Sequence, residues 1–205
     1  FLFGPTRNAI EKSPYLEAFK SRKIEVLLTF EPIDEFVMNH AQSFKENSLT
    51  SADSADLDLD AIAPESSNDT QAEALDPESE KSLCEFLKKT LSNIKEVSSS
   101  ARLINSPAMI VNSDKMMTAQ MKKMMKAMQK ADGIPDAETN IHLEVNPKHP
   151  LIKNLSTLHL SNPEIAETIA HQILDTARVS AGLIEDPSAL VERNYKIMEQ
   201  LSNRI

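Results

Sequence analysis

Hydrophobic and polar positions in the first 45 residues follow helical and strand-like patterns in turn. A helical pattern begins at Ser13-Pro14, where a capping serine precedes a first-turn proline. The apolar run 24–30 (IEVLLTF) predicts a buried strand, and a second helix begins at Glu31-Pro32. The helical positions are Tyr15, Leu16, Phe19, Ile33, Phe36, Val37 and His40. This order of helix, strand and helix predicts a small α/β layer.

The pattern in residues 77–205 predicts helices packed on a three-stranded sheet. Strands are expected at 96–104, 108–112 and 141–145, where β-rich apolar runs end at turn residues. Helices are expected from Asp76-Pro77, over 114–130, after Pro150, over 163–181 and from Asp186-Pro187 almost to Ile205. The predicted fold class is therefore α+β: a small α/β remnant, then helices on a sheet, ending in a helical hairpin.

Residues 46–76 separate these two patterned regions. The segment is rich in Ser, Asp and Ala and has no aromatic residue, a composition that cannot bury enough surface to order itself. It is predicted to be a flexible acidic linker, with two interpretations open: a solvated spacer, or a decoy for basic partners. The predicted domains are 1–45, the linker 46–76, and 77–205.

Composition changes this picture in three ways. The chain has 22 basic and 31 acidic residues among its 205, and residues 46–80 hold 11 of the acids and no Lys or Arg. The net charge of −9 is therefore local to one segment. Three scattered glycines exclude a phosphate-binding loop, and one cysteine excludes a disulfide framework or a cysteine-based zinc site. The start, Phe1-Leu2-Phe3, is typical of a strand cut in mid-course and predicts a fragment of a longer protein.

Methionines mark the helix expected over 114–130. Five of them fall in an arc of about 100° on one face, lysines lie nearly opposite, and Met116 lies on the flank. Flexible, polarizable Met suits a surface that meets many apolar shapes, whereas a core helix usually uses Leu, Ile and Val. A core stripe and a membrane-surface helix remain as alternatives. The candidate binding residues are Met116, Met117, Met121, Met124, Met125 and Met128.

The terminal hairpin carries apolar stripes on both of its predicted helices. Two such helices cannot bury their faces fully on each other, so a two-fold four-helix bundle is predicted, with packing on the rest of the domain as the alternative. The candidate dimer-interface residues are Ile165, Ile169, Ile173, Leu174, Leu190, Val191, Asn194, Ile197, Met198 and Leu201.

Catalytic and metal-binding patterns are absent from the sequence. The five histidines form no metal-ligand spacing, and Cys84 has no evident histidine partner, so no catalytic residue and no metal site is predicted. Residues 87–194 contain no aromatic residue on which bases could stack, so no nucleic-acid partner is expected. No stretch approaches the roughly 18 apolar residues of a membrane span, and no membrane partner is expected either.

Several runs resemble the 90-kDa heat-shock chaperones. SPYLEAFKSRKIEVLLTFEPIDEF (13–36) is similar to the end of their middle domain, and ARLINSPAMIV (101–111) to the start of their C-terminal sheet. HLEVNPKHPLI (142–152) resembles the strand and turn that follow, and the pair around Glu185-Asp186-Pro187 resembles their dimerisation helices. The resemblance covers nearly the whole chain except the linker.

The resemblance implies the dimerisation and client-binding part of an ATP-dependent chaperone that binds partly unfolded proteins. It implies a homodimer joined by the last two helices, with the methionine helix facing clients. The ATP and magnesium site would precede Phe1, so no cofactor and no enzymatic activity are expected of this fragment. The alternative is a scaffold whose methionine face binds one fixed partner.

The ending LSNRI departs from the acidic tail of the eukaryotic cytosolic members. No co-chaperone that reads such a tail is therefore expected. The ending favours a bacterial, HtpG-like, cytoplasmic member, with a mitochondrial member as the alternative.

Overall fold

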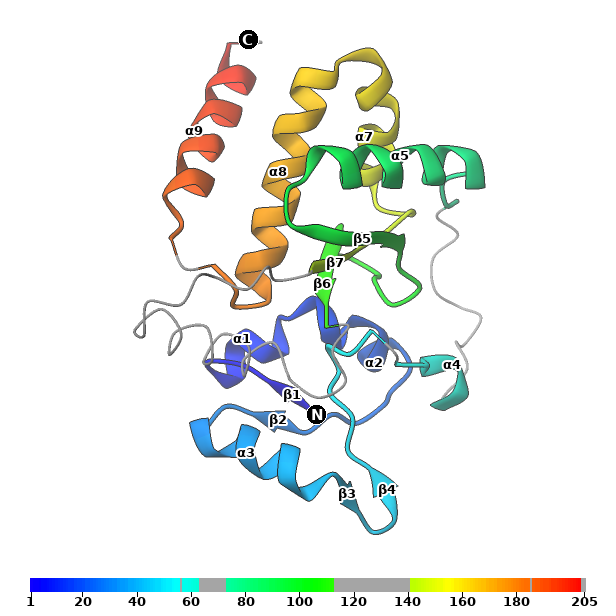
Figure 1. Ribbon diagram of the computed structural model, residues 1–205, viewed down its shortest axis with the longest axis vertical. Coiled ribbons are helices and arrows are strands. Elements are labelled where there is room, and N and C mark those ends of the chain that lie inside the picture. Colours follow the sequence, from blue (N-terminus) through cyan, green and yellow to red (C-terminus); the bar gives the residue numbers. More distant parts are fainter. Residues whose placement is uncertain (56, 63–72, 113–140, 185, 204–205) are drawn as a thin grey trace.

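The computed structural model describes residues 1–55, 57–62, 73–112, 141–184 and 186–203. Figure 1 shows two parts, one above the other: a lower body built from residues 1–62 and an upper body built from the described residues after 72. The elements of the lower body are β1 (Leu2–Phe3), α1 (Arg7–Glu11), the 3₁₀ turn η1 (Pro14–Leu16), α2 (Glu17–Ser21), β2 (Leu28–Thr29), α3 (Pro32–Ala41), β3 (Ser43–Phe44), β4 (Asn47–Ser48) and α4 (Leu59–Ile62).

The upper body is a three-stranded sheet covered by helices. The strand order is β5-β7-β6, with β5 parallel and β6 antiparallel to the central strand β7. Its elements are α5 (Pro77–Thr90), β5 (Ile94–Ser99), β6 (Ala108–Val111), β7 (Ile141–Val145), α7 (Pro150–Ser161), α8 (Pro163–Ser180) and α9 (Ser188–Ser202). The mixed α+β class and the three strands expected after residue 76 are confirmed.

Most helices begin where the sequence signals predict. The Asp76 carboxylate accepts hydrogen bonds from the backbone N–H groups of Glu78 and Ser79 at the start of α5, which lowers its pKa. The Asn162 side chain caps α8, and His149 Nδ1 accepts from the backbone of Leu151 at the start of α7. Each of these helices has proline in its first turn, where the missing N–H group is not needed.

Strand β6 separates the two hydrophobic cores. Ala108 and Ile110 belong to the core of the upper body, together with Leu143 on β7 and Leu174 on α8. Met109 and Val111 belong to the core of the lower body. Because successive strand residues face opposite sides, one four-residue strand contributes to both cores.

The structure corrects the prediction of a buried strand over 24–30. Only Leu28–Thr29 form a strand, which pairs in parallel with β1 in a two-stranded sheet. Val26 and Leu28 pack against the lower core, but Leu27 is 57% exposed and Phe30 41% exposed. An apolar run on a narrow sheet can have one face covered and the other open, which the run alone does not reveal.

Part of the predicted linker 46–76 is packed against the lower body. Ala52 and Leu59 are buried there, and Asp53 and Ala55 make backbone hydrogen bonds with Asn112. Two apolar side chains therefore pack in the lower core from a stretch whose average composition is polar. The three domain boundaries remain a prediction.

Gly182 ends α8 in the left-handed conformation, with φ of +67° and no atom within 4 Å of the position that a Cβ atom would take. The sequence predicts this helix stop. We expect Gly182→Ala to lower the free energy of unfolding by about 1 kcal/mol, because only backbone strain opposes the new side chain. Gly182→Asn should cost less, since Asn tolerates this conformation. Equal losses in urea denaturation would contradict this explanation.

Candidate functional site

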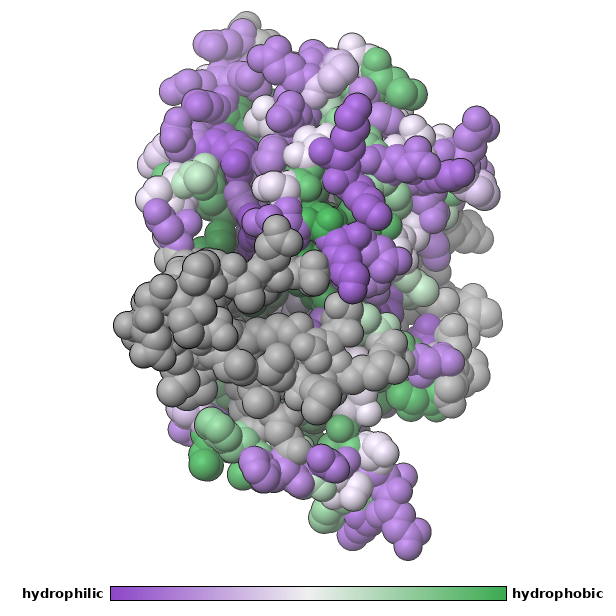
Figure 2. Space-filling view, in the orientation of Figure 1, coloured by the Kyte–Doolittle hydropathy of each residue, from purple (hydrophilic) through white to green (hydrophobic). Residues whose placement is uncertain are grey.

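An exposed apolar surface covers α3 and the segments beside it. We call it the α3 surface; its members are Leu27, Phe30, Ile33, Phe36, Val37 and Phe44, all exposed in the described part of the chain. Figure 2 shows hydrophobic residues over the beginning of α3 at the lower edge of the molecule. Because Ile33, Phe36 and Val37 share one exposed face of a helix, we take this surface as the candidate interaction site.

Local interactions fix α3 without burying this face. The Asp34 carboxylate accepts from the backbone N–H groups of Phe30 (3.1 Å) and Glu31 (3.0 Å), forming a capping box with the side chain of Glu31. Pro32 stands in the first turn, where its fixed φ favours a helix. The helix can therefore present Ile33, Phe36 and Val37 to solvent and stay formed.

The hairpin of β3 and β4 extends the α3 surface. Phe44 is exposed there, and the Lys45 ammonium lies 5.4 Å from the centre of its ring. Lys45 and Glu46 both have positive φ, the conformation of a tight hairpin turn. The turn thus holds a large aromatic ring and a cation just past the C-terminal end of α3.

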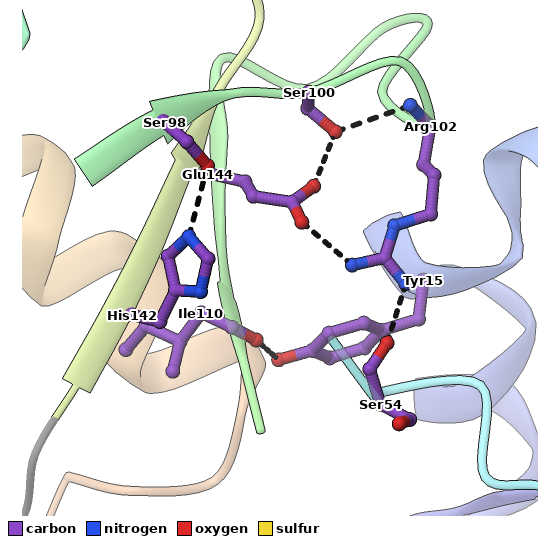
Figure 3. Close-up of polar contacts among 8 residues, drawn as sticks. All are labelled: Tyr15, Ser54, Ser98, Ser100, Arg102, Ile110, His142 and Glu144. Carbon is purple, nitrogen blue, oxygen red and sulfur yellow. Dashed lines mark hydrogen bonds and ion pairs between the residues drawn. The ribbon is translucent and has the colours of Figure 1, made fainter. Parts of the chain in front are cut away.

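The junction between the two bodies is polar as well as apolar (Figure 3). Arg102 donates from Nη2 to Glu144 (2.7 Å) and from Nη1 to the carbonyl oxygen of Ser54 (2.7 Å), so it bridges the bodies. Ser100 donates to the other oxygen of Glu144 at 2.6 Å. The Tyr15 hydroxyl donates to the carbonyl of Ile110, and burial raises the pKa of that hydroxyl well above its usual range.

The predicted methionine site lies outside the described residues. Its members, Met116, Met117, Met121, Met124, Met125 and Met128, all fall between residues 113 and 140. The methionines are conspicuous in the sequence by their number and spacing. The exposed apolar residues of α3 are recognisable there only as a helical pattern. Helical spacing of apolar residues next to an apolar run such as 24–30 is typical of a helix face that is buried. The sequence alone therefore favours burial of this face.

The structure divides the predicted dimer-interface residues into three groups, buried, half-buried and exposed. Ile173 and Leu174 are 4% and 1% exposed and pack in the chain's own upper core, where they already have partners within the chain. Ile165, Ile169, Leu190 and Ile197 are half-buried. Val191, Asn194, Met198 and Leu201 are exposed. No residue of α9 is buried within the described chain, and Tyr195, which the sequence pattern does not single out, lies exposed among them.

Charged residues hold α9 beside α8. Asp175 on α8 forms ion pairs with Arg193 on α9 and, at 3.2 Å, with Arg178 on its own helix. Leu190, Arg193 and Ile197 therefore face α8. Val191, Tyr195 and Met198 form a separate, exposed stripe along α9.

The cysteine and two of the histidines lie in surroundings that do not indicate catalysis. Burial and the nearby Glu80 raise the pKa of the Cys84 thiol to about 11, which disfavours a nucleophilic thiolate. His142 pairs with Ser98 at 2.8 Å, and His159 with Ser82 at 3.1 Å. Among the described residues no His, Cys, Asp and Glu side chains group as metal ligands would. No helix in the described part of the chain has the length and apolar character needed to cross a membrane.

Comparison with known proteins identifies the family. The family model described as "Hsp90 protein" matches residues 1–204. The chaperone protein HtpG of Desulfotalea psychrophila is 41% identical over 206 residues, covering 100% of this chain and 33% of that protein. HtpG of Desulfitobacterium hafniense is 36% identical, covering 98% and 31%. The mitochondrial heat shock protein 75 kDa of Rattus norvegicus is 33% identical, covering 94% and 28%.

The chain belongs to the Hsp90 family. The resemblance drawn from residues 13–36, 101–111 and 142–152 is thereby confirmed. The chain spans about a third of the length of the curated relatives it matches. The two bacterial relatives are named as chaperone proteins, and the rat relative is named as a heat shock protein.

Proposed function

We propose that the chain is the dimerisation and client-binding part of an ATP-dependent chaperone that binds partly unfolded proteins. The observation that carries this proposal is the α3 surface, an exposed apolar face on a chain of a chaperone family. The bacterial relatives support a bacterial protein, which we propose to be cytoplasmic, and the mitochondrial relatives support the alternative. ATP binding and hydrolysis would belong to the part of the family's length that this chain does not span.

The chemistry of the α3 surface suits partly unfolded clients. Burial of apolar area is a non-directional attraction, so one surface can accept many sequences. Phe30, Phe36 and Phe44 offer large rings, while Ile33 and Val37 add aliphatic area between them. We propose that the methionine residues 116–128 add to this client surface, as the family resemblance implies.

Replacing Ile33, Phe36 and Val37 together by Ser should weaken client binding at least about tenfold. Three exposed side chains that each contribute about 0.5–1 kcal/mol on being covered account for that factor. The measurement is a titration with a permanently unfolded protein, such as reduced and carboxymethylated α-lactalbumin, followed by fluorescence anisotropy.

The matched control is Ile62→Ser with Leu160→Ser, two exposed aliphatic residues that do not belong to the α3 surface. This control should bind the unfolded protein as the parent does. Unchanged binding by the α3 variant, or equal losses in both variants, would exclude the α3 surface as a client site. Binding of only one among several unrelated unfolded proteins would point instead to a scaffold with a fixed partner.

We further propose that two copies associate through the exposed stripe of α9, with α8 beside it, as the family resemblance implies. Val191, Asn194, Met198 and Leu201 are the interface residues that the chain's own packing leaves exposed. Leu190 and Ile197 would support the stripe from the side that faces α8.

A further inference from the structure

Glu17, the first residue of α2, joins the lower body to one loop of the upper body. Its Oε2 accepts hydrogen bonds from three successive backbone N–H groups, those of Ile104 (2.7 Å), Asn105 (2.8 Å) and Ser106 (3.2 Å). Its Oε1 accepts from the hydroxyl of Ser106 at 2.5 Å. One carboxylate from the lower body thus accepts hydrogen bonds from three successive N–H groups and one hydroxyl of the loop between β5 and β6.

The same loop is held rigidly on its other side by Asn146. The Asn146 amide donates to the carbonyls of Ile104 (3.3 Å) and Ser106 (3.2 Å), and its backbone N–H donates to Pro107 at 2.9 Å. Asn146 is 1% exposed and follows the central strand β7 directly. The position of the loop is therefore fixed relative to the upper sheet. A group that binds the loop from the lower body is thereby linked to the whole upper body.

We propose that Glu17 is a latch that fixes the orientation of the lower body, with its α3 surface, relative to the upper body, with its terminal helices. Its partners are backbone donors in a partly exposed loop, so water can replace the carboxylate when the latch opens. The backbone pairing of Asp53 and Ala55 with Asn112 lies at the other end of β6 and would remain as the pivot, together with the other hydrogen bonds across the junction and the β6 side chains that pack in the lower core. Glu17 would set this orientation whether or not the α3 surface binds clients.

The latch can be tested by measuring distances between the two bodies. Spin labels at Lys12→Cys on the lower body and Lys89→Cys on the upper body, in a Cys84→Ser chain, report the orientation by double electron–electron resonance. Mixing with excess unlabelled chain removes signals between subunits. The parent should give one narrow distance distribution, and Glu17→Ala should broaden it at least twofold.

Controls separate release of the latch from loss of folding. Glu25→Ala removes an exposed acid from the lower body and should leave the distribution narrow. A second label pair within the lower body, at Lys12 and Ser43, should be unaffected by Glu17→Ala. An unchanged distribution between the bodies, or equal broadening within the lower body, would overturn the proposal.

A charge test addresses the contact itself. Ser106→Asp places a second carboxylate against that of Glu17, and repulsion should broaden the distribution as Glu17→Ala does. In the double variant Ser106→Asp with Glu17→Gln, the glutamine amide can donate to the new carboxylate while its oxygen accepts from the loop, so the narrow distribution should return. Ser106→Ala, which only removes the hydroxyl, should have a smaller effect. Absence of rescue in the double variant would count against a direct contact.

Discussion

A Val191→Asp, Met198→Asp variant is expected to sediment as a monomer, whereas we expect the parent chain to sediment as a dimer at the same concentration. Both side chains are exposed on the stripe of α9 that the chain's own fold leaves uncovered. In a two-fold interface each substitution occurs twice, so four unpaired carboxylates would be placed against apolar area. We expect the dimer dissociation constant to rise at least a hundredfold, measured by sedimentation equilibrium.

The matched control places the same residue type on the opposite face of α9. Ala189 and Lys196 are both exposed and have the same seven-residue spacing. Ala189→Asp with Lys196→Asp changes the charge more strongly, yet should leave the dimer intact. Both variants should retain the helical circular dichroism of the parent, because no α9 side chain is buried within the described chain. A dimeric Val191→Asp, Met198→Asp variant would exclude this face as the interface.

Arg102→Met should cost about 3 kcal/mol in the free energy of unfolding, because its loss strands a buried charge. Arg102 and Glu144 pair at 2.7 Å with side chains only 12% and 10% exposed, so removing the cation leaves a nearly buried carboxylate without its ion-pair partner. The loss should appear as a lower urea midpoint with an unchanged slope. Adding Glu144→Gln to Arg102→Met should recover part of the loss, because the stranded charge is then gone.

The same substitution at an exposed pair provides the comparison. Arg7 and Glu11 lie at 2.8 Å, but their side chains are 72% and 47% exposed. Arg7→Met should therefore change stability by less than about 0.5 kcal/mol, since solvent screens such a pair. Equal effects of Arg7→Met and Arg102→Met would show that burial of the Arg102–Glu144 pair does not determine its contribution.

The local part of the fold could be predicted because short-range chemistry determines it. Asp76-Pro77 and Asn162-Pro163 start helices through contacts within three residues, and Gly182 ends one through its own backbone conformation. The strand 141–145 is recognisable from its alternation and its Asn-Pro ending. These signals need no knowledge of the rest of the chain.

Features that depend on distant partners could not be predicted. Nothing near Glu17 indicates that its carboxylate binds a loop far along the chain, or that Arg102 spans two bodies. Ile33, Phe36 and Val37 have the spacing of a core helix, and only the tertiary structure shows them exposed. Ile173 and Leu174 have the spacing of an interface stripe, and only the packing of α8 on β6 shows them buried.

The shared strand β6 has a consequence for dividing this protein into parts. A fragment of residues 77–205 would retain β6 but lose the lower body that covers Leu103, Met109 and Val111. These side chains would then form a new apolar face along a sheet, a surface prone to self-association. The chain therefore cannot be cut between the two bodies without exposing apolar side chains. A soluble fragment must keep the lower body or carry polar substitutions on the outer face of this strand.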